Sequence, residues 1–127
     1  MKTVLVPIAP GFEEIETITV VDILRRAGAQ VTLAGTEEGP LKGSRGILVL
    51  PDDSLNNIME KDFDLIVLHG GQPGTDNLRK DARVTQLLKK MNGLRKNIAA
   101  ICAAPLVLMD AGILGNRYIT SHPSVQN

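Results

Sequence analysis

Short, continuous runs of apolar residues alternate along the chain with longer amphipathic segments. Such runs are typical of parallel β-strands that are covered on both faces, because these strands lack the alternation of half-exposed ones. They predict buried strands at residues 3–8, 31–34, 64–68 and 98–102. We also expect a shorter strand at residues 47–50, in a small hairpin or at a sheet edge. A last strand is expected to begin at residues 118–120.

The amphipathic segments between these runs predict three helices, at residues 13–28, 81–93 and 104–112. In the first helix the apolar residues at helical spacing, expected to face inward, are Ile15, Ile18, Val21 and Leu24. Acidic residues open this helix and arginines close it, which complements the helix dipole. In the second helix the residues expected to face inward are Val84, Leu87, Leu88 and Met91.

The alternation of strands and helices predicts an α/β fold with a mostly parallel sheet, right-handed crossovers and helices on both faces. A chain of 127 residues is expected to form a single domain. In such folds the working site lies outside the carboxyl ends of the strands. Four segments should therefore meet at one edge of the sheet: residues 9–16, 69–74, 102 and 121–123.

Composition excludes several classes of function. Lys plus Arg and Asp plus Glu each number 14, so bulk charge attracts neither nucleic acid nor an anionic membrane. A single cysteine forms no internal disulfide, and the N-terminal apolar run is too short and interrupted for a signal peptide. No apolar window approaches the length that spans a bilayer. These features predict a cytoplasmic protein in a reducing compartment.

Cys102, the only cysteine, stands where a predicted strand gives way to a predicted helix. The unsatisfied N–H groups of a helix N-terminus favour a thiolate, so we expect this turn to lower the pKa of Cys102 and to present a nucleophile. The alternative at this point is that Cys102 is a small buried hydrophobic residue that only fills space.

Other groups at the same edge would assist a thiolate. Gly70 and Gly71 let backbone N–H groups approach a ligand or an oxyanion, although an ordinary tight turn explains them equally well. Glu16, unlike Glu13 and Glu14, is expected to face the edge. There, a carboxyl group beside a thiolate would keep its proton and donate a hydrogen bond to sulfur. For Glu13 and Glu14 the helix dipole is a sufficient explanation.

Two histidines, His69 and His122, follow predicted strands and could join Cys102 in a metal site. The closely spaced ligand pairs of structural zinc sites are missing, so metal binding is not favoured. His122 is better explained as assisting the cysteine, or as a turn residue before Pro123. Neither a dinucleotide-binding nor a phosphate-binding glycine motif occurs, and we expect no cofactor.

The chain resembles the ThiJ/PfpI superfamily, in its DJ-one branch, which contains the Parkinson-disease protein. The matching motifs occur in family order across nearly the whole chain: GFEEIET, VDILRRAG, SRGILVLPD, LIVLHGGQPGTDNL, AAICAAP and TSHP. The resemblance implies a flavodoxin-like three-layer sandwich, formed by one class I glutamine amidotransferase-like domain over residues 1–127. Family members continue past this point, so it also implies a domain that lacks its C-terminal portion.

The resemblance also assigns expected roles. Glu16 falls on the family's protonated glutamate, and Cys102 on its cysteine at the strand-to-helix elbow. The N–H groups of Gly71 and Ala103 would face the substrate oxygen, and His122 falls on a nearby histidine. Arg26 and Arg45 match arginines near the dimer contact and an anion-binding edge.

Two departures from the related sequences bear on function. His69 replaces a proline that usually precedes the paired glycines, which would add a polar group to the rim of the pocket. Intracellular peptidases of the superfamily carry a histidine directly after the nucleophile, whereas this chain has Ala103 there. Peptidase activity is therefore disfavoured.

The leading hypothesis is a cofactor-free glyoxalase III or deglycase that uses Cys102 on methylglyoxal, glyoxal or their early adducts. An alternative is a stress-protective protein or chaperone that senses oxidation through the same cysteine. A third is a small-ligand binder without catalysis. Expected partners are a second copy in a homodimer and, as a separate chain, the protein's own C-terminal fragment.

Overall fold

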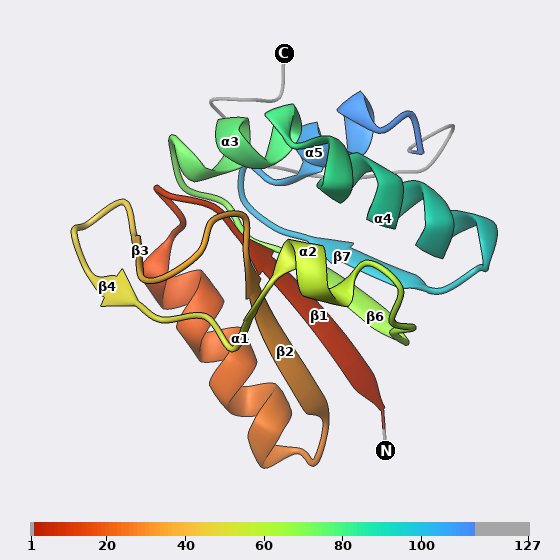
Figure 1. Ribbon diagram of the computed structural model, residues 1–127, viewed down its shortest axis with the longest axis horizontal. Helices are drawn as coiled ribbons and strands as arrows, with labels where there is room; N and C mark the ends of the chain where they lie inside the picture. The colour runs from red at the N-terminus through yellow and green to blue at the C-terminus, as the bar shows by residue number, and fades with distance from the viewer. Residues whose placement is uncertain (1, 114–127) are drawn as a thin grey trace.

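The computed structural model describes residues 2–113 and has a five-stranded parallel sheet at its centre (Figure 1). The strand order is β5-β2-β1-β6-β7. The strands are β1 (Thr3–Ile8), β2 (Gln30–Gly35), β5 (Asp53–Ser54), β6 (Leu65–Leu68) and β7 (Asn97–Ala100). The short strands β3 (Leu41–Lys42) and β4 (Leu48–Val49) form a separate antiparallel pair, which confirms the hairpin predicted around residues 47–50.

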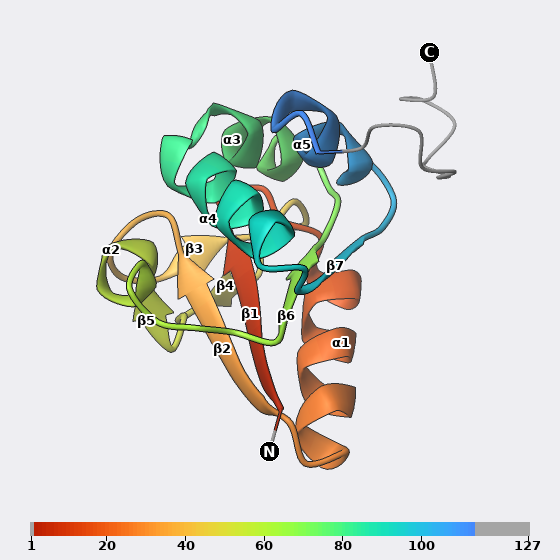
Figure 2. The same ribbon diagram turned by 90° about the vertical axis from the view of Figure 1, so that its right-hand side faces the viewer.

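Helices cover both faces of the sheet, as the alternating pattern predicts. The helix α1 (Glu14–Arg26) lies on one side. The other side carries α2 (Leu55–Ile58), α3 (Gly74–Lys80), α4 (Ala82–Gly93) and α5 (Pro105–Asp110). Figures 1 and 2 show this separation of α1 from α3, α4 and α5. The predicted three-layer α/β architecture is confirmed.

Two apolar cores lie on the two faces because side chains alternate along each strand. On β6, Ile66 and Leu68 pack with α4 and α5, whereas Val67 packs in the core that contains Val21 of α1. The ladder between β6 and β7 pairs Leu68 with Ala100, so these two strands end side by side. This register places the loops that follow them at one edge of the sheet.

The predicted inward face is right for α4 and only partly right for α1, where Val21 is buried and Leu24 packs against the core. Val84, Leu87, Leu88 and Met91 are all buried in α4. In α1 the buried residues are Glu14, Thr17 and Val21, while Ile15 and Ile18 are 76% and 45% exposed. The error arises because a buried acidic residue, Glu14, occupies the position that the apolar pattern assigns to solvent.

Several short elements carry no clear pattern in the sequence, namely β5, α2 and α3. The predicted strand at residues 98–102 is shorter than expected, because β7 ends at Ala100. The predictions for residues 118–120 and for His122 lie outside the described residues. Within residues 2–113, no helix combines the length and the apolar character needed to cross a membrane.

Candidate active site

Cys102 lies two residues past the end of β7, in the turn that leads into α5. Its φ angle is +58°, a left-handed conformation that non-glycine residues rarely adopt. The preceding turn is fixed to the neighbouring strand, because the N–H of Ile101 donates to the carbonyl of Leu68 at 3.2 Å. The side chain is half-buried. A strained turn at the end of a strand is a recurrent feature of active sites.

Gly70, in the loop after β6, lies directly against this cysteine. A Cβ atom added to Gly70 would lie 2.8 Å from Cβ and 3.1 Å from Sγ of Cys102, and 3.0 Å from the N atom of Ala103. No ordinary side chain fits at these distances without displacing its neighbours. The need for glycine at this position is therefore steric.

Glu16, in the first turn of α1, completes a group of three. Its Oε1 atom accepts a hydrogen bond of 2.9 Å from the N–H of Gly70, 54 residues away in the sequence. Its carboxyl group also acts on the Cys102 thiol, whose pKa it raises. The structure therefore brings together Glu16, Gly70 and Cys102, which sequence analysis placed at one edge of the sheet.

The electrostatics at Cys102 differ from the sequence-based expectation. Burial raises the pKa of the thiol, and the negative charge of an ionised Glu16 raises it further. A hydrogen bond from the N–H of Ala103 acts in the opposite direction but is outweighed. The predicted lowering by the following helix is therefore not obtained while Glu16 is ionised.

The expected oxyanion donors have different surroundings. The N–H of Ala103 faces the sulfur. Gly71 has a φ angle of +91° and packs against the turn formed by residues 11–13. Among the hydrogen bonds of residues 2–113, none uses the Gly71 N–H, so this donor remains available to a ligand.

His69 is buried rather than placed at the rim of the pocket, which corrects the expectation from the sequence. Its side chain is 2% exposed, and within residues 2–113 neither ring nitrogen has a hydrogen-bond partner. Burial lowers the pKa of His69 from 6.5 to about 4, so the imidazole is neutral near pH 7. The residue is therefore a core side chain beside the site.

The role of Glu14 is not predicted by any pattern in the sequence. This carboxylate accepts backbone hydrogen bonds from Arg45 at 2.9 Å and Ile47 at 3.2 Å, and another from the hydroxyl of Ser44 at 3.2 Å. Burial opposes ionisation, but these hydrogen bonds lower the pKa of Glu14 overall. Glu14 thus attaches the turn between β3 and β4 to the start of α1. No local pattern marks such a contact, because its partners lie 30 residues or more away.

The two arginines expected at the dimer and anion-binding edge are both exposed. Arg26 lies at the far end of α1 from Glu16 and pairs with Asp22 at 2.8 Å. Arg45 lies in the hairpin turn that Glu14 holds. In the described part of the chain, no group of three His, Cys, Asp or Glu side chains is close enough to hold a metal ion.

The fold agrees with comparisons to known proteins. A sequence profile of the DJ-1/PfpI family matches residues 2–127, and the chain belongs to this family. Protein dj-1beta of Drosophila melanogaster is 43% identical over 126 residues, which cover 98% of this chain and 67% of the fly protein. The solved structure of oxidized Toxoplasma gondii DJ-1 has a TM-score of 0.95 and 38% identity, over 98% of this chain and 68% of that one.

A third relative carries a name that states an activity. "Glutathione-independent glyoxalase DJR-1.2" of Caenorhabditis elegans is 39% identical over 130 residues, which cover 99% of this chain and 67% of the nematode protein. A glyoxalase-type activity therefore occurs within the family. The chain spans about two thirds of each of these three relatives.

Proposed function

We propose that this protein is a cysteine-dependent glyoxalase that converts methylglyoxal or glyoxal to the corresponding hydroxy acid without glutathione. The observation that carries the proposal is the hydrogen bond from the Gly70 N–H to the Glu16 carboxyl, with Cys102 packed directly against Gly70. A nucleophile with an acid–base group in hydrogen-bonding reach is the arrangement that covalent catalysis needs. The named activity of the nematode relative supports the same reaction.

In this proposal Glu16 and Cys102 share one proton, and Glu16 holds it. Removing the charge of Glu16 removes one cause of the raised pKa of Cys102, and a protonated carboxyl donates a hydrogen bond to the thiolate. The N–H of Ala103 adds a second donor to sulfur. Gly70 binds the carboxyl oxygen and leaves the other oxygen of Glu16 free to carry the proton.

The reaction begins when the Cys102 thiolate adds to the aldehyde carbon of methylglyoxal. A C–S bond forms, and the carbonyl oxygen takes the negative charge near the N–H groups of Gly71 and Ala103. Glu16 then gives its proton to this oxygen, which yields a hemithioacetal and a carboxylate. No outside oxidant or reductant is needed, because the substrate carries both the aldehyde that is oxidised and the ketone that is reduced.

The remaining steps are an isomerisation and a hydrolysis. The Glu16 carboxylate removes the proton from the former aldehyde carbon and returns it to the neighbouring carbon, while the hydroxyl proton moves between the two oxygens. The product is a thioester of lactate with Cys102. Water cleaves the C–S bond, releases lactate and restores the cysteine. His122 is expected to assist these proton transfers.

The test is formation of lactate from methylglyoxal in the absence of glutathione. We expect wild type to produce lactate and Cys102→Ala to produce none above the uncatalysed rate. Thr85→Ala, a change of similar size in α4, is the matched control and should retain activity. Equal lactate formation by wild type and Cys102→Ala would refute the mechanism.

A second candidate is an oxidation-sensing protective protein. It is favoured by the single, half-buried cysteine and by the similarity to a DJ-1 solved in an oxidized state. With one cysteine in the chain, oxidation cannot end in an internal disulfide and would proceed to sulfenic and sulfinic acids. The lactate assay separates the two candidates, because only the first predicts lactate as a product.

A further inference from the structure

His69 is the first residue after β6, and its imidazole lies inside the protein. The side chain is 2% exposed, and within residues 2–113 neither Nδ1 nor Nε2 has a hydrogen-bond partner. Burying an imidazole without a hydrogen bond costs free energy, and burying an unpaired imidazolium costs much more. The side chain is therefore held in the core only while its imidazole is neutral.

The next residue, Gly70, is attached to the candidate active site by three contacts. Its N–H donates to Oε1 of Glu16 at 2.9 Å, and its carbonyl accepts from the N–H of Glu13 at 3.1 Å. A Cβ atom at Gly70 would lie 3.1 Å from Sγ of Cys102, so its backbone and the cysteine are in close contact. Because His69 is one peptide bond away, movement of its side chain out of the core disturbs these contacts.

No charged group near this loop compensates a protonated His69. The titratable groups of the neighbouring segments are Glu13 and Glu16 at the start of α1, Asp76 in α3 and Cys102 in the turn before α5. Burial is the cause that lowers the pKa of His69 to about 4, and none of these groups within residues 2–113 adds a stabilising charge. Protonation of His69 is therefore coupled to its exposure to water.

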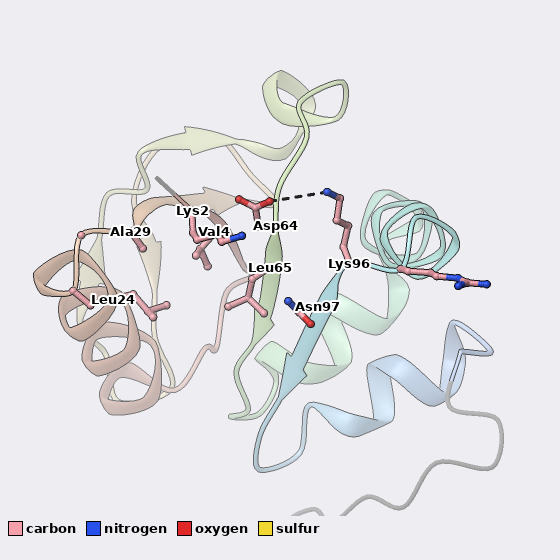
Figure 3. Close-up of a pocket in the computed structure, with 11 residues that line it drawn as sticks. Lys2, Val4, Leu24, Ala29, Asp64, Leu65, Lys96 and Asn97 are labelled. Carbon is pink, nitrogen blue, oxygen red and sulfur yellow. Dashed lines mark ion pairs between the residues drawn. The ribbon is translucent and has the colours of Figure 1, made fainter.

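The acidic group at the other end of the sheet has partners. A pocket of about 670 Å³ lies there, at the amino ends of the strands, and Figure 3 shows Asp64 of this pocket paired with Lys96. Asp64 also accepts from the N–H and the hydroxyl of Thr3 at 2.9 and 3.2 Å, and these bonds lower its pKa from the ordinary value of 3.8. Its charge therefore stays constant in the pH range in which an exposed imidazole titrates.

We infer that His69 is a positioning residue whose neutral imidazole keeps the loop of residues 69–73 closed on Glu16 and Cys102, and whose protonation favours opening of that loop while the sheet stays folded. His69 takes no part in the proposed chemical steps. The inference deepens the proposed function, because it names a control on the same site. The site is assembled near neutral pH and is loosened reversibly in acid.

Amide hydrogen exchange of Gly70, followed by NMR, tests this inference. The hydrogen bond to Glu16 protects the Gly70 N–H, and the readout is the protection factor, which is the exchange rate of an unstructured amide at the same pH divided by the measured rate. We expect this factor to fall about twentyfold in wild type from pH 7 to pH 5, because His69 titrates near 6.5 when exposed and near 4 when buried.

Urea distinguishes opening of the loop from unfolding of the whole protein. Opening of a short loop exposes little surface, so low concentrations of urea should leave the protection factor of Gly70 unchanged. The reference is the amide of Leu5, which lies in the central strand β1 between β2 and β6. Its protection factor should be higher than that of Gly70 and should fall as urea is added.

His69→Met is the matched variant, because methionine is apolar, similar in size and does not titrate. Its Gly70 protection factor should lose most of the dependence on pH, although Glu16 is still present. His69→Pro, which introduces the residue that related sequences usually carry there, should behave in the same way. This second variant covers the case in which His69→Met does not fold.

Three results would overturn the inference. The first is a wild-type Gly70 protection factor that is the same at pH 7 and pH 5, and the second is an equal fall in wild type and in the folded His69 variants. The third is a Gly70 amide that matches Leu5 in protection and in its response to urea, because the loop would then open only on global unfolding. Exchange is measured without substrate, so failure of this inference is distinguishable from failure of the lactate assay.

Discussion

At the scale of single residues, His69 is a buried side chain whose two ring nitrogens have no hydrogen-bond partner among residues 2–113. An imidazole that is buried without a hydrogen-bond partner has lost its interaction with water and gained nothing in exchange. Its position directly before Gly70 places it next to the loop that contacts Cys102. The chain therefore carries a titratable group in its core that does not belong to the proposed reaction.

Stability should fall as the pH is lowered through the range in which His69 titrates. The unfolded chain binds a proton near pH 6.5, whereas the folded protein does so only near pH 4, so acid favours the unfolded state within this window. The loss from pH 7 to pH 4 is about 3 kcal/mol from this residue. Urea unfolding at several pH values should show it, and His69→Met should lack it. Parallel pH profiles for the two proteins would contradict the assignment.

At the scale of elements, the site depends on how closely two loops approach each other. The loop after β6 and the turn after β7 meet at Gly70 and Cys102, and α1 supplies Glu16 to both. Parallel pairing of β6 with β7 fixes this meeting point, because it sets where the two strands end. A change of a few tenths of an ångström in either loop alters the alignment of the nucleophile.

Gly70→Ala should therefore reduce glyoxalase activity on the order of a hundredfold, because the added methyl group displaces Cys102 or Ala103. The matched control is Gly93→Ala at the end of α4, where an added Cβ meets nothing within 4 Å. That control should keep full activity and gain up to about 1 kcal/mol of stability. The readout is lactate formation together with a thermal melt. Equal activities for the two variants would argue against the steric account.

Sequence patterns correctly predicted the buried face of a helix where the buried side chains are apolar. The face of α4 was predicted correctly because Val84, Leu87, Leu88 and Met91 follow a helical period. The face of α1 was predicted only in part, because its buried side includes Glu14 and Thr17 beside Val21, and the burial of Glu14 depends on a distant hairpin. The meeting of Glu16 with Gly70 and Cys102 follows from the rule for parallel sheets. The distribution of charge between Glu16 and Cys102 depends on their burial and separation, which the sequence does not define.

At the scale of the whole molecule, exposed apolar side chains gather on α1 and the neighbouring hairpin. Ile15, Ile18, Ile47 and Leu48 are 76%, 45%, 55% and 65% exposed, and Glu14 connects the two elements that carry them. Exposed patches of this kind mark interaction surfaces. We propose that this patch is the contact of the homodimer that the family resemblance implies.

Replacing Ile15 and Leu48 together by lysine should convert a dimer to a monomer, because two buried charges would face each other across a two-fold axis. Light scattering coupled to size-exclusion chromatography gives the mass. Leu94→Lys, at a side chain that is 55% exposed after α4, is the control and should remain dimeric. A wild-type protein that is monomeric, or a double variant that is dimeric, would rule out this surface.

The central claim is that Glu16 holds the proton that it shares with Cys102. The most direct test is to titrate the Cys102 thiolate, through its ultraviolet absorbance, in wild type and in Glu16→Gln. Because this chain has a single cysteine, the signal reports one residue. The account predicts that the thiolate forms at lower pH in wild type than in Glu16→Gln, since an amide is a weaker donor to sulfur than a carboxyl group. A wild-type thiolate that forms only at high pH, and at lower pH in Glu16→Gln, would show that Glu16 is ionised and would contradict the account.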